Sequence, residues 1–332
     1  MVINIERDIK EKGFIDAPAL SGKELRDEID RLRREKNVVI LAHYYQRSEV
    51  QDIADFTGDS LALSREAAET DAGIILFAGV HFMAETAKIL SPEKKVLLPD
   101  LNAGCSMADS CPADEFEKFI RKNPGRTVIT YVNTTAEVKT LSDIVCTSSN
   151  AVRIVNSLPE SEKIIFAPDR NLGQYVRELT RRKDMLIWDG SCHVHRKFSR
   201  KKIMVLKKKY PYAKIIAHPE CEKEVREVSE YLGSTAQLVE YTKKDKGKTY
   251  IVATEPGVIH EMKKHNPEKE YIPAPPTGMT ACVCSECEYM KMITLEKIYN
   301  TLKYELPEVT LEEEVIRKAV IPIKRMLEIT GK

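Results

Sequence analysis

The chain has 332 residues, of which 42% are hydrophobic and 31% charged; this composition supplies a packed core with a solvated surface and excludes a disordered chain. Its 52 Lys and Arg residues against 51 Asp and Glu leave a net charge of +1, so no field of one sign attracts nucleic acid or lipid. The longest apolar run, at residues 73–80, is far shorter than the roughly 20 residues that span a bilayer, and residues 1–13 lack the apolar region of a secretory signal. We therefore expect a cytoplasmic protein whose eight cysteines are metal ligands, catalytic groups or buried thiols rather than disulfides.

Strands and helices alternate from the start of the chain. A capping box at Ser21 and Glu24 predicts a charged helix to about Lys36. The β-branched run VVILAHYYQ follows as a strand, and a second capping box, at Ser48 and Gln51, opens another helix. The next expected elements are a helical stretch at 61–69, a strand at 74–79, a helix at 82–90 and a strand at 95–100.

The same order returns twice, at a period of about 87 residues, and such a period is the sign of repeated domains. The runs TVITYVNTT and KIIAHPECE match VVILAHYYQ, which aligns His43 with Tyr131 and His218, at spacings of 88 and 87 residues. Tyr45, Asn133 and Glu220 stand two residues further on, and Ser60, Ser148 and Thr235 stand seventeen residues after the first set. The later copies add a capping box at Thr134 and Glu137, helices at 150–158, 172–182 and 258–266, and strands at 164–169, 185–190, 250–257 and 270–275.

Alternating strands and helices favour parallel sheets covered by helices. We expect an α/β protein made of three homologous α/β/α domains with small parallel sheets around a pseudo-threefold axis, with the active site at its centre. The predicted parts are an N-terminal arm (1–21), three repeats (22–108, 109–195 and 196–306) and a C-terminal helical tail (307–332). The Pro-rich stretch 267–276 is the clearest irregular segment.

Polar side chains follow the first strand of each copy, where parallel α/β sheets bind ligands. His43, Tyr45, Tyr131, Asn133, His218 and Glu220 would line one central pocket. The alternative is that each group caps its own helix or bonds to its own loop. Ser60, Ser148 and Thr235 precede helical stretches, where backbone N–H groups favour an anion; a plain N-cap is the alternative for each of them. Together these residues suggest a substrate with several carboxylates or phosphates.

Each copy also places a cysteine after its third strand: Cys105, Cys192 and one of Cys282, Cys284 and Cys287. The distances from Ser60 and Ser148, 45 and 44 residues, weakly favour Cys282, which lies 47 residues after Thr235. The spacing to the next proline after the following helix, 19 residues in the first two copies, favours Cys287, which lies 20 residues before its proline. Because the Pro-rich stretch distorts only the first measure, we assign Cys287. Cys111, Cys146 and Cys221 match nothing across the copies and are interpreted as structural.

Three converging thiolates could hold zinc or an iron–sulfur cluster. A cluster with three cysteine ligands leaves one iron open to act as a Lewis acid. The alternatives are buried, inert thiols and a local zinc site in the CVCSEC run, which lacks an evident fourth ligand.

With these residues in view, the sequence resembles the quinolinate synthase family, iron–sulfur enzymes of de novo NAD biosynthesis. The resemblance covers nearly the whole chain. It is carried by LAHYYQRSEVQDIADFTGDSLALS, FAGVHFMAETAKILSP, YVNTTAEVKTLSD, FAPDRNLGQYV, GSCHVHRKF, HPEC, ATEPGVIHEM and CEYMKMITLEKIY. It implies three α/β domains about a pseudo-threefold axis, and condensation of iminoaspartate with dihydroxyacetone phosphate to quinolinate, with loss of phosphate and water. It also implies a functional link to an iminoaspartate-producing enzyme.

The resemblance further implies a 4Fe–4S cluster held by Cys105, Cys192 and Cys287, with the fourth iron open. The residues implied to contact substrate are His43, Tyr45, Ser60, Tyr131, Asn133, Ser148, His195, His218, Glu220, Ser234 and Thr235. His195 and Ser234 enter only through the resemblance. Tyr45 and Glu220 are the candidates for proton transfer, with His43, His195 and His218 assisting, and the Ser and Thr residues would bind carboxylates and phosphate.

One segment departs from the family pattern. Cys282 and Cys284 precede Cys287 in a CxCxxC spacing, and Glu288 stands where a proline is common. Redox control by a disulfide and exposed spare thiols are the two alternatives there. The rival functions are an electron-transfer protein that uses the same thiolates and an iron–sulfur hydro-lyase.

Overall fold

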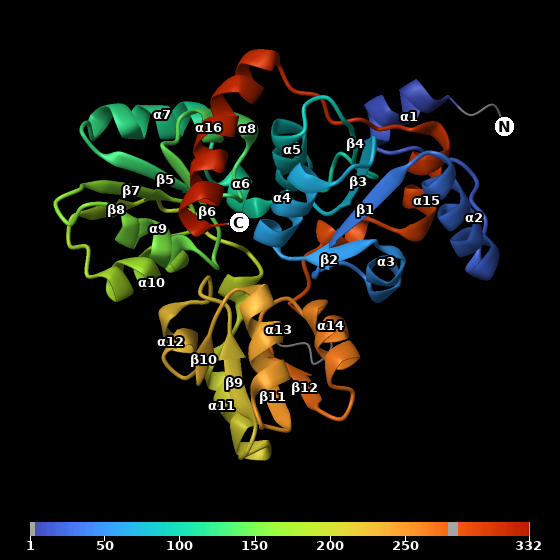
Figure 1. Cartoon of the computed structure of the whole chain (residues 1–332). Coiled ribbons are helices and arrows are strands. Elements are labelled where there is room, and N and C mark those ends of the chain that lie inside the picture. The colour runs from blue at the N-terminus through green and yellow to red at the C-terminus, as the bar shows by residue number, and fades with distance from the viewer. Residues whose placement is uncertain (1–3, 278–284, 332) are drawn as a thin grey trace. The chain divides into compact units, whose positions relative to one another are not determined.

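The computed structural model describes residues 4–277 and 285–331 (Figure 1). Cys282 and Cys284 therefore lie outside the described residues. Contacts divide the chain into two compact units. The first comprises residues 1–105, 135–140 and 288–320, and the second comprises residues 106–134, 141–287 and 321–332. Among the described residues, no helix combines the length and the apolar character that a membrane crossing needs.

The first unit contains one parallel sheet in the order β2-β1-β3-β4. Its strands are β1 (Val38–His43), β2 (Phe56–Gly58), β3 (Ile74–Ala78) and β4 (Lys95–Leu97). β1 and β3 pair from Val38–Ile74 to Ala42–Ala78, and both are almost wholly buried, which explains their nearly continuous apolar sequences. The helices are α1 (Ile5–Lys12), α2 (Gly22–Glu35), α3 (Ser48–Ile53), α4 (Ser60–Glu69), α5 (His81–Leu90), α8 (Ala136–Thr140), η2 (Met290–Met292) and α15 (Leu295–Tyr304).

The second unit contains two parallel sheets, in the orders β6-β5-β7-β8 and β10-β9-β11-β12. The strands of the first are β5 (Thr127–Tyr131), β6 (Ile144–Cys146), β7 (Ile164–Ala167) and β8 (Met185–Ile187), and those of the second are β9 (Lys214–Ala217), β10 (Tyr231–Leu232), β11 (Thr249–Ala253) and β12 (Glu270–Pro273). The helices are α6 (Ser106–Asp109), α7 (Ala113–Lys122), α9 (Ala151–Ser157), α10 (Arg170–Thr180), η1 (His195–Lys197), α11 (Arg200–Lys209), α12 (Lys223–Arg226), α13 (Thr235–Lys244) and α14 (Val258–His265). The last helix, α16 (Glu313–Thr330), has residues in both units; it falls within the predicted C-terminal tail, whose bounds stay a prediction.

All three sheets share one strand order, which Figure 1 displays in blue, green and yellow to orange. The predicted α/β class with parallel sheets is confirmed. Each sheet has four strands where the sequence predicts three, because β2, β6 and β10 have only two or three residues and so lack a readable pattern. The strands of each sheet fall within one predicted repeat; the repeat boundaries and the pseudo-threefold axis stay predictions.

The predicted capping boxes are wrong in detail. Ser21 occupies the N-cap of α2 without a side-chain bond, and α3 begins at Ser48 itself, so that Arg47 is the N-cap. In the third box, the hydroxyl of Thr135, not Thr134, accepts the N–H of Val138 at 3.4 Å. Each motif marks a helix start, but its register is set by the backbone that enters the helix.

Candidate active site

The carboxyl ends of β5 and β9 bring three predicted site residues together in the second unit. Tyr131 is the last residue of β5, whereas His218 and Glu220 follow the end of β9. The Tyr131 hydroxyl donates to Oε1 of Glu220 at 2.6 Å. Both side chains are buried, so this bond between two sheets lies in a site from which water is largely excluded.

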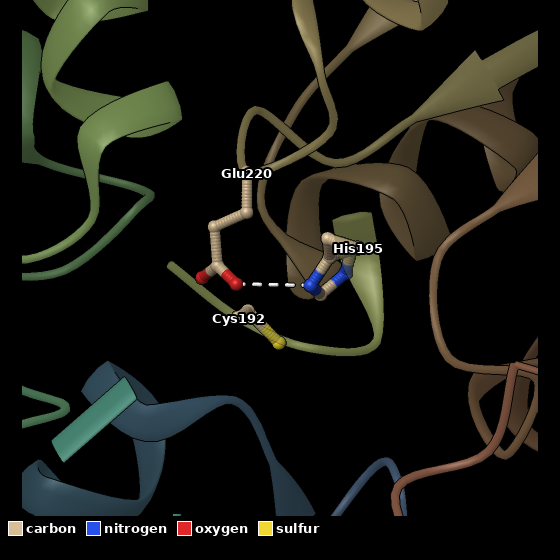
Figure 2. Close-up of side chains that lie close together, drawn as sticks. All are labelled: Cys192, His195 and Glu220. Atoms are coloured by element: carbon tan, nitrogen blue, oxygen red, sulfur yellow. Dashed lines mark ion pairs between the residues drawn. The ribbon is translucent and has the colours of Figure 1, made fainter. Parts of the chain in front are cut away.

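His195 holds the other oxygen of the same carboxyl group. It opens η1, shortly after β8, and its Nδ1 lies 2.9 Å from Oε2 of Glu220 (Figure 2). Its Nε2 lies 3.0 Å from the hydroxyl of Thr254, and its ring stacks on that of His218 with centroids 4.7 Å apart. Both oxygens of Glu220 are thus held, which gives the carboxyl group one orientation.

His218 is a neutral imidazole in this site. Burial lowers its pKa to about 3, so the ring carries no charge at pH 7. The N–H of Glu220 donates to Nδ1 of His218 at 3.3 Å, which leaves the ring proton on Nε2. That nitrogen lies 3.2 Å from the Ser148 hydroxyl, so His218 links Ser148 to the Glu220 loop.

Glu220 is ionised in the same surroundings. Burial raises the pKa of its carboxyl, but His218, His195 and Tyr131 outweigh that effect and hold the pKa well below its usual range. The opposite holds for Asp169: burial and the charge of Glu220 raise the pKa of its carboxyl to about 8. Two buried carboxyl groups in one region thus differ in protonation because Glu220 has imidazole and hydroxyl neighbours, whereas Asp169 receives backbone N–H groups.

The remaining polar residues of the second unit have mixed placements. Oδ1 of Asn133 is buried and has no hydrogen-bond partner among the described residues, so it can accept from a ligand. Ser234 is the N-cap of α13 and its hydroxyl accepts the N–H of Gln237 in a complete capping box. Thr235 is the first residue of that helix and is buried. For Ser234 the structure therefore shows the capping role, while Thr235 lies inside the helix start rather than at the cap.

The first unit holds the other four predicted residues. Nδ1 of His43, at the end of β1, accepts the N–H of Tyr45 at 3.1 Å, and the two rings meet edge to face with centroids 4.5 Å apart. Ser60 is the first residue of α4, which Asp59 caps, and Cys105 ends a segment of this unit. That these residues join Glu220 in one pocket stays a prediction.

The cysteines fall into two classes. Cys105, Cys192 and Cys287 are half-buried, whereas Cys111, Cys146 and Cys221 are fully buried. Burial raises the pKa of the Cys111 thiol to about 12, and it also raises the pKa of the other two buried thiols, which suits structural residues. Cys192, His195 and Glu220 have ligand atoms within 4.8 Å of one another (Figure 2), so this part of the site also offers metal donors.

Comparison with known proteins assigns the chain. The family model described as NadA, quinolinate synthetase A protein, matches residues 27–328. The chain belongs to the quinolinate synthase family. The predicted family and its enzyme activity, quinolinate synthesis in de novo NAD biosynthesis, are thereby confirmed.

Individual quinolinate synthases support this assignment along the chain. The relative from Gloeothece citriformis is 58% identical over 302 residues, which are 91% of this chain and 93% of that protein. The relative from Synechocystis sp. is 56% identical over 305 residues, 92% and 95% of the two chains. A solved structure, described as E-1-hydroxy-2-methyl-but-2-enyl-4-diphosphate reductase from Plasmodium falciparum, aligns over 89% of this chain and 96% of its own. Its 11% identity and TM-score of 0.34 carry no argument about the fold.

Sequence reasoning missed four buried residues beside the site of this quinolinate synthase. Thr254 contacts His195, and Nδ2 of Asn171 donates to the backbone oxygen of Glu220 at 3.1 Å. Asp169 and Glu255 contact the backbone of Cys192 and Cys287. All but Asn171 lie one or two residues after the matched strands β7 and β11, so the available signal was a comparison of the second and third copies alone, since the first copy has Val80 where these have Asp169 and Glu255.

Proposed function

We propose that this quinolinate synthase condenses iminoaspartate with dihydroxyacetone phosphate to quinolinate, with loss of phosphate and water. The observation that carries the proposal is the buried carboxylate of Glu220, held between Tyr131 and His195. Condensation and dehydration need protons to be removed and returned at defined atoms. A fixed, ionised carboxylate with two proton-bearing neighbours is suited to this task.

We propose that Cys105, Cys192 and Cys287 hold a 4Fe–4S cluster with one open iron. The donor set fits, because these three thiols are half-buried and the other described thiols are fully buried. Thiolate sulfurs are the usual ligands of such clusters. When bound, the cluster supplies a Lewis acid that polarises a substrate oxygen.

Glu220 is the proposed proton acceptor. Entry of a substrate that bears carboxylates adds negative charge near Glu220, which raises its pKa and its tendency to take a proton. Tyr131 and His195 keep its two oxygens oriented, and neutral His218 positions the loop through the N–H of Glu220. We propose Tyr45 as the second proton-transfer residue, oriented by His43.

The anionic groups of the substrates would meet hydroxyls and amides. We propose Ser60, Ser148 and Thr235, with Ser234 through its helix start, as binders of carboxylate and phosphate, because backbone N–H groups at helix starts favour anions. Asn133 adds a buried acceptor, Oδ1, for a substrate hydroxyl or amine. We further propose that the protein acts in the cytoplasm and takes iminoaspartate from the enzyme that produces it.

The test is turnover by the anaerobically reconstituted protein. Supplied with iminoaspartate and dihydroxyacetone phosphate, it should release quinolinate and phosphate in equal amounts, measured by chromatography and a phosphate assay. An electron-transfer protein would make neither product, and a hydro-lyase would make no quinolinate. Protein with full iron and sulfide content that forms no quinolinate would contradict the proposal.

A further inference from the structure

Buried carboxyl groups hold the backbone of two cysteines in the second unit. Oδ2 of Asp169 accepts the N–H of Cys192 at 3.0 Å, and Oε1 of Glu255 accepts the N–H of Cys287 at 3.4 Å. Each acid stands two residues after the end of a matched strand, β7 or β11. The same position in two sheets thus contacts the same atom of the two cysteine loops.

Both acids have the same double attachment. Their side chains are 0% exposed, and each uses its second oxygen on its own segment. Oδ1 of Asp169 accepts the N–H of Leu172 at 2.8 Å, and Oε2 of Glu255 accepts the N–H of Gly257 at 2.7 Å. Each carboxyl group therefore ties a cysteine loop to the fixed end of a sheet, and these bonds offset part of the cost of burying it.

The three cysteine loops are anchored in different ways. In the first unit the matched position, two residues after β3, is Val80, whose side chain has no acceptor atom. The backbone N–H of the next residue, His81, donates to the backbone oxygen of Ala103 at 2.7 Å. The equivalent bond runs from Arg170 to Gly190 at 2.8 Å. The third copy has Pro256 at this point, which cannot donate.

The loops of Cys105 and Cys192 thus each have a backbone bond of the same kind. The loops of Cys192 and Cys287 each have a bond to a buried carboxyl group. Since Pro256 removes the backbone bond from the third loop, Glu255 is the attachment that this loop retains at the matched position.

We propose that Asp169 and Glu255 are positioning residues, which fix the peptide plane at Cys192 and Cys287 and so aim the two sulfurs at the iron. The proposal rests on the ligand assignment made above. Once the N–H of a cysteine is held, only rotation about its N–Cα bond and about its own side chain is left to place Sγ. Groups that orient a metal ligand in this way typically change metal retention by about 10–100-fold when removed.

The first measurement is amide hydrogen exchange of the full chain without its cluster. Asp169→Ala should speed exchange at Cys192 by about tenfold or more, because local opening then needs one bond fewer, and should leave Cys287 unchanged. Glu255→Ala should speed exchange at Cys287 by a similar factor and leave Cys192 unchanged. Ser199→Ala is the matched control. Ser199 is the N-cap of α11, and its hydroxyl accepts the N–H of Lys202 but bonds to no cysteine that the structure describes.

The second measurement is loss of the reconstituted cluster to a chelator, followed by its visible absorbance. Asp169→Ala and Glu255→Ala should each lose iron about tenfold faster. Asp169→Asn and Glu255→Gln keep one acceptor oxygen and should be intermediate, and they serve as the test if an alanine variant fails to fold. Ser199→Ala should match the unmodified protein in both measurements.

Three outcomes overturn the proposal: unchanged exchange at the tethered cysteine, equal loosening of both loops by either substitution, or equal loosening by Ser199→Ala. Failure of the ligand assignment looks different. Cys192→Ala would then keep its full cluster while the exchange results stand. Loss of the cluster in Cys192→Ala, with normal exchange in Asp169→Ala, would remove only the positioning role.

Discussion

The two ends of the three sheets carry polar side chains at matched positions, but those side chains have different partners. At the amino ends an acidic residue follows the first strand and accepts an N–H of that strand. Each lies 15 residues after its donor: Asp55 bonds to Ile40, Asp143 to Val128 and Glu230 to Ile215. These acids are exposed, and each bonds to a strand of its own sheet.

At the carboxyl ends of β5 and β9 the partners come from another sheet. Glu220, after β9, bonds to Tyr131 of β5 and to His195, which follows β8. Its side chain is 4% exposed. Equal spacing across copies therefore does not separate an acid that bonds within its own sheet from one that joins two sheets; burial and the origin of the partner do.

The largest expected effect concerns the carboxyl-end thiols. Cys192→Ala should abolish the cluster, because a proposed ligand is lost, whereas Cys146→Ala, at the end of β6 and fully buried, should keep it. Iron content and visible absorbance of the anaerobically purified proteins measure this. Cys146→Ala should instead lower the free energy of unfolding by about 1 kcal/mol through a small cavity. A full cluster in Cys192→Ala would show that Cys192 is no more a ligand than the buried Cys146.

The next effect compares two acids of the second unit. Glu220→Gln should lower kcat by about 10²–10⁴-fold, the usual contribution of a proton-transfer group, with the cluster spectrum unchanged. Asp143→Asn weakens a bond to the N–H of Val128 and should cost about 1 kcal/mol of unfolding free energy, with kcat within about twofold. Steady-state kinetics and urea unfolding separate the two results. Normal turnover by Glu220→Gln would refute its role.

Much of the fold could be predicted because its pattern is local. Apolar strands such as 38–43 and the helices between them are read from neighbouring residues, and the matched spacing of His43, Tyr131 and His218 indicates repeated sheets. The edge strand Tyr231–Leu232 has only two residues and carries no pattern. Likewise, the cap at Thr135 instead of Thr134 depends on backbone angles that the sequence does not encode separately.

The site could be predicted in part. Tyr131 at the end of β5 and Glu220 after β9 both stand at repeat positions, but the bond between them joins two sheets through residues 89 apart in the chain, which no local pattern encodes. His195 lies outside the matched positions and was found only through family motifs. Asp169 and Glu255 differ from Val80 at the matched position, so a strict repeat comparison would have discarded them.

The smallest effect is a pH dependence at the amino end of the first sheet. Lys36 and Lys95 hold the Glu305 carboxylate, at 2.8 and 2.6 Å, and lower its pKa to about 2. The ordinary value is about 4.3, so unfolding takes up a proton between these values. The stabilisation is fully present above about pH 4.3 and is lost as the pH falls toward 2. It amounts to about 1 kcal/mol, because the pair is partly exposed.

Glu305→Gln should therefore lower the unfolding free energy at pH 6 by that amount and change it little near pH 2, as measured by urea unfolding across this range. Glu69→Gln is the control, because Glu69 is exposed at the end of α4 and forms no ion pair with any residue that the structure describes. A deficit of Glu305→Gln that stayed constant down to pH 2 would assign the effect to packing rather than to charge. A large fall in turnover at pH 7 would show that the amino ends also serve the reaction, and the contrast between the two ends of the sheets would then fail.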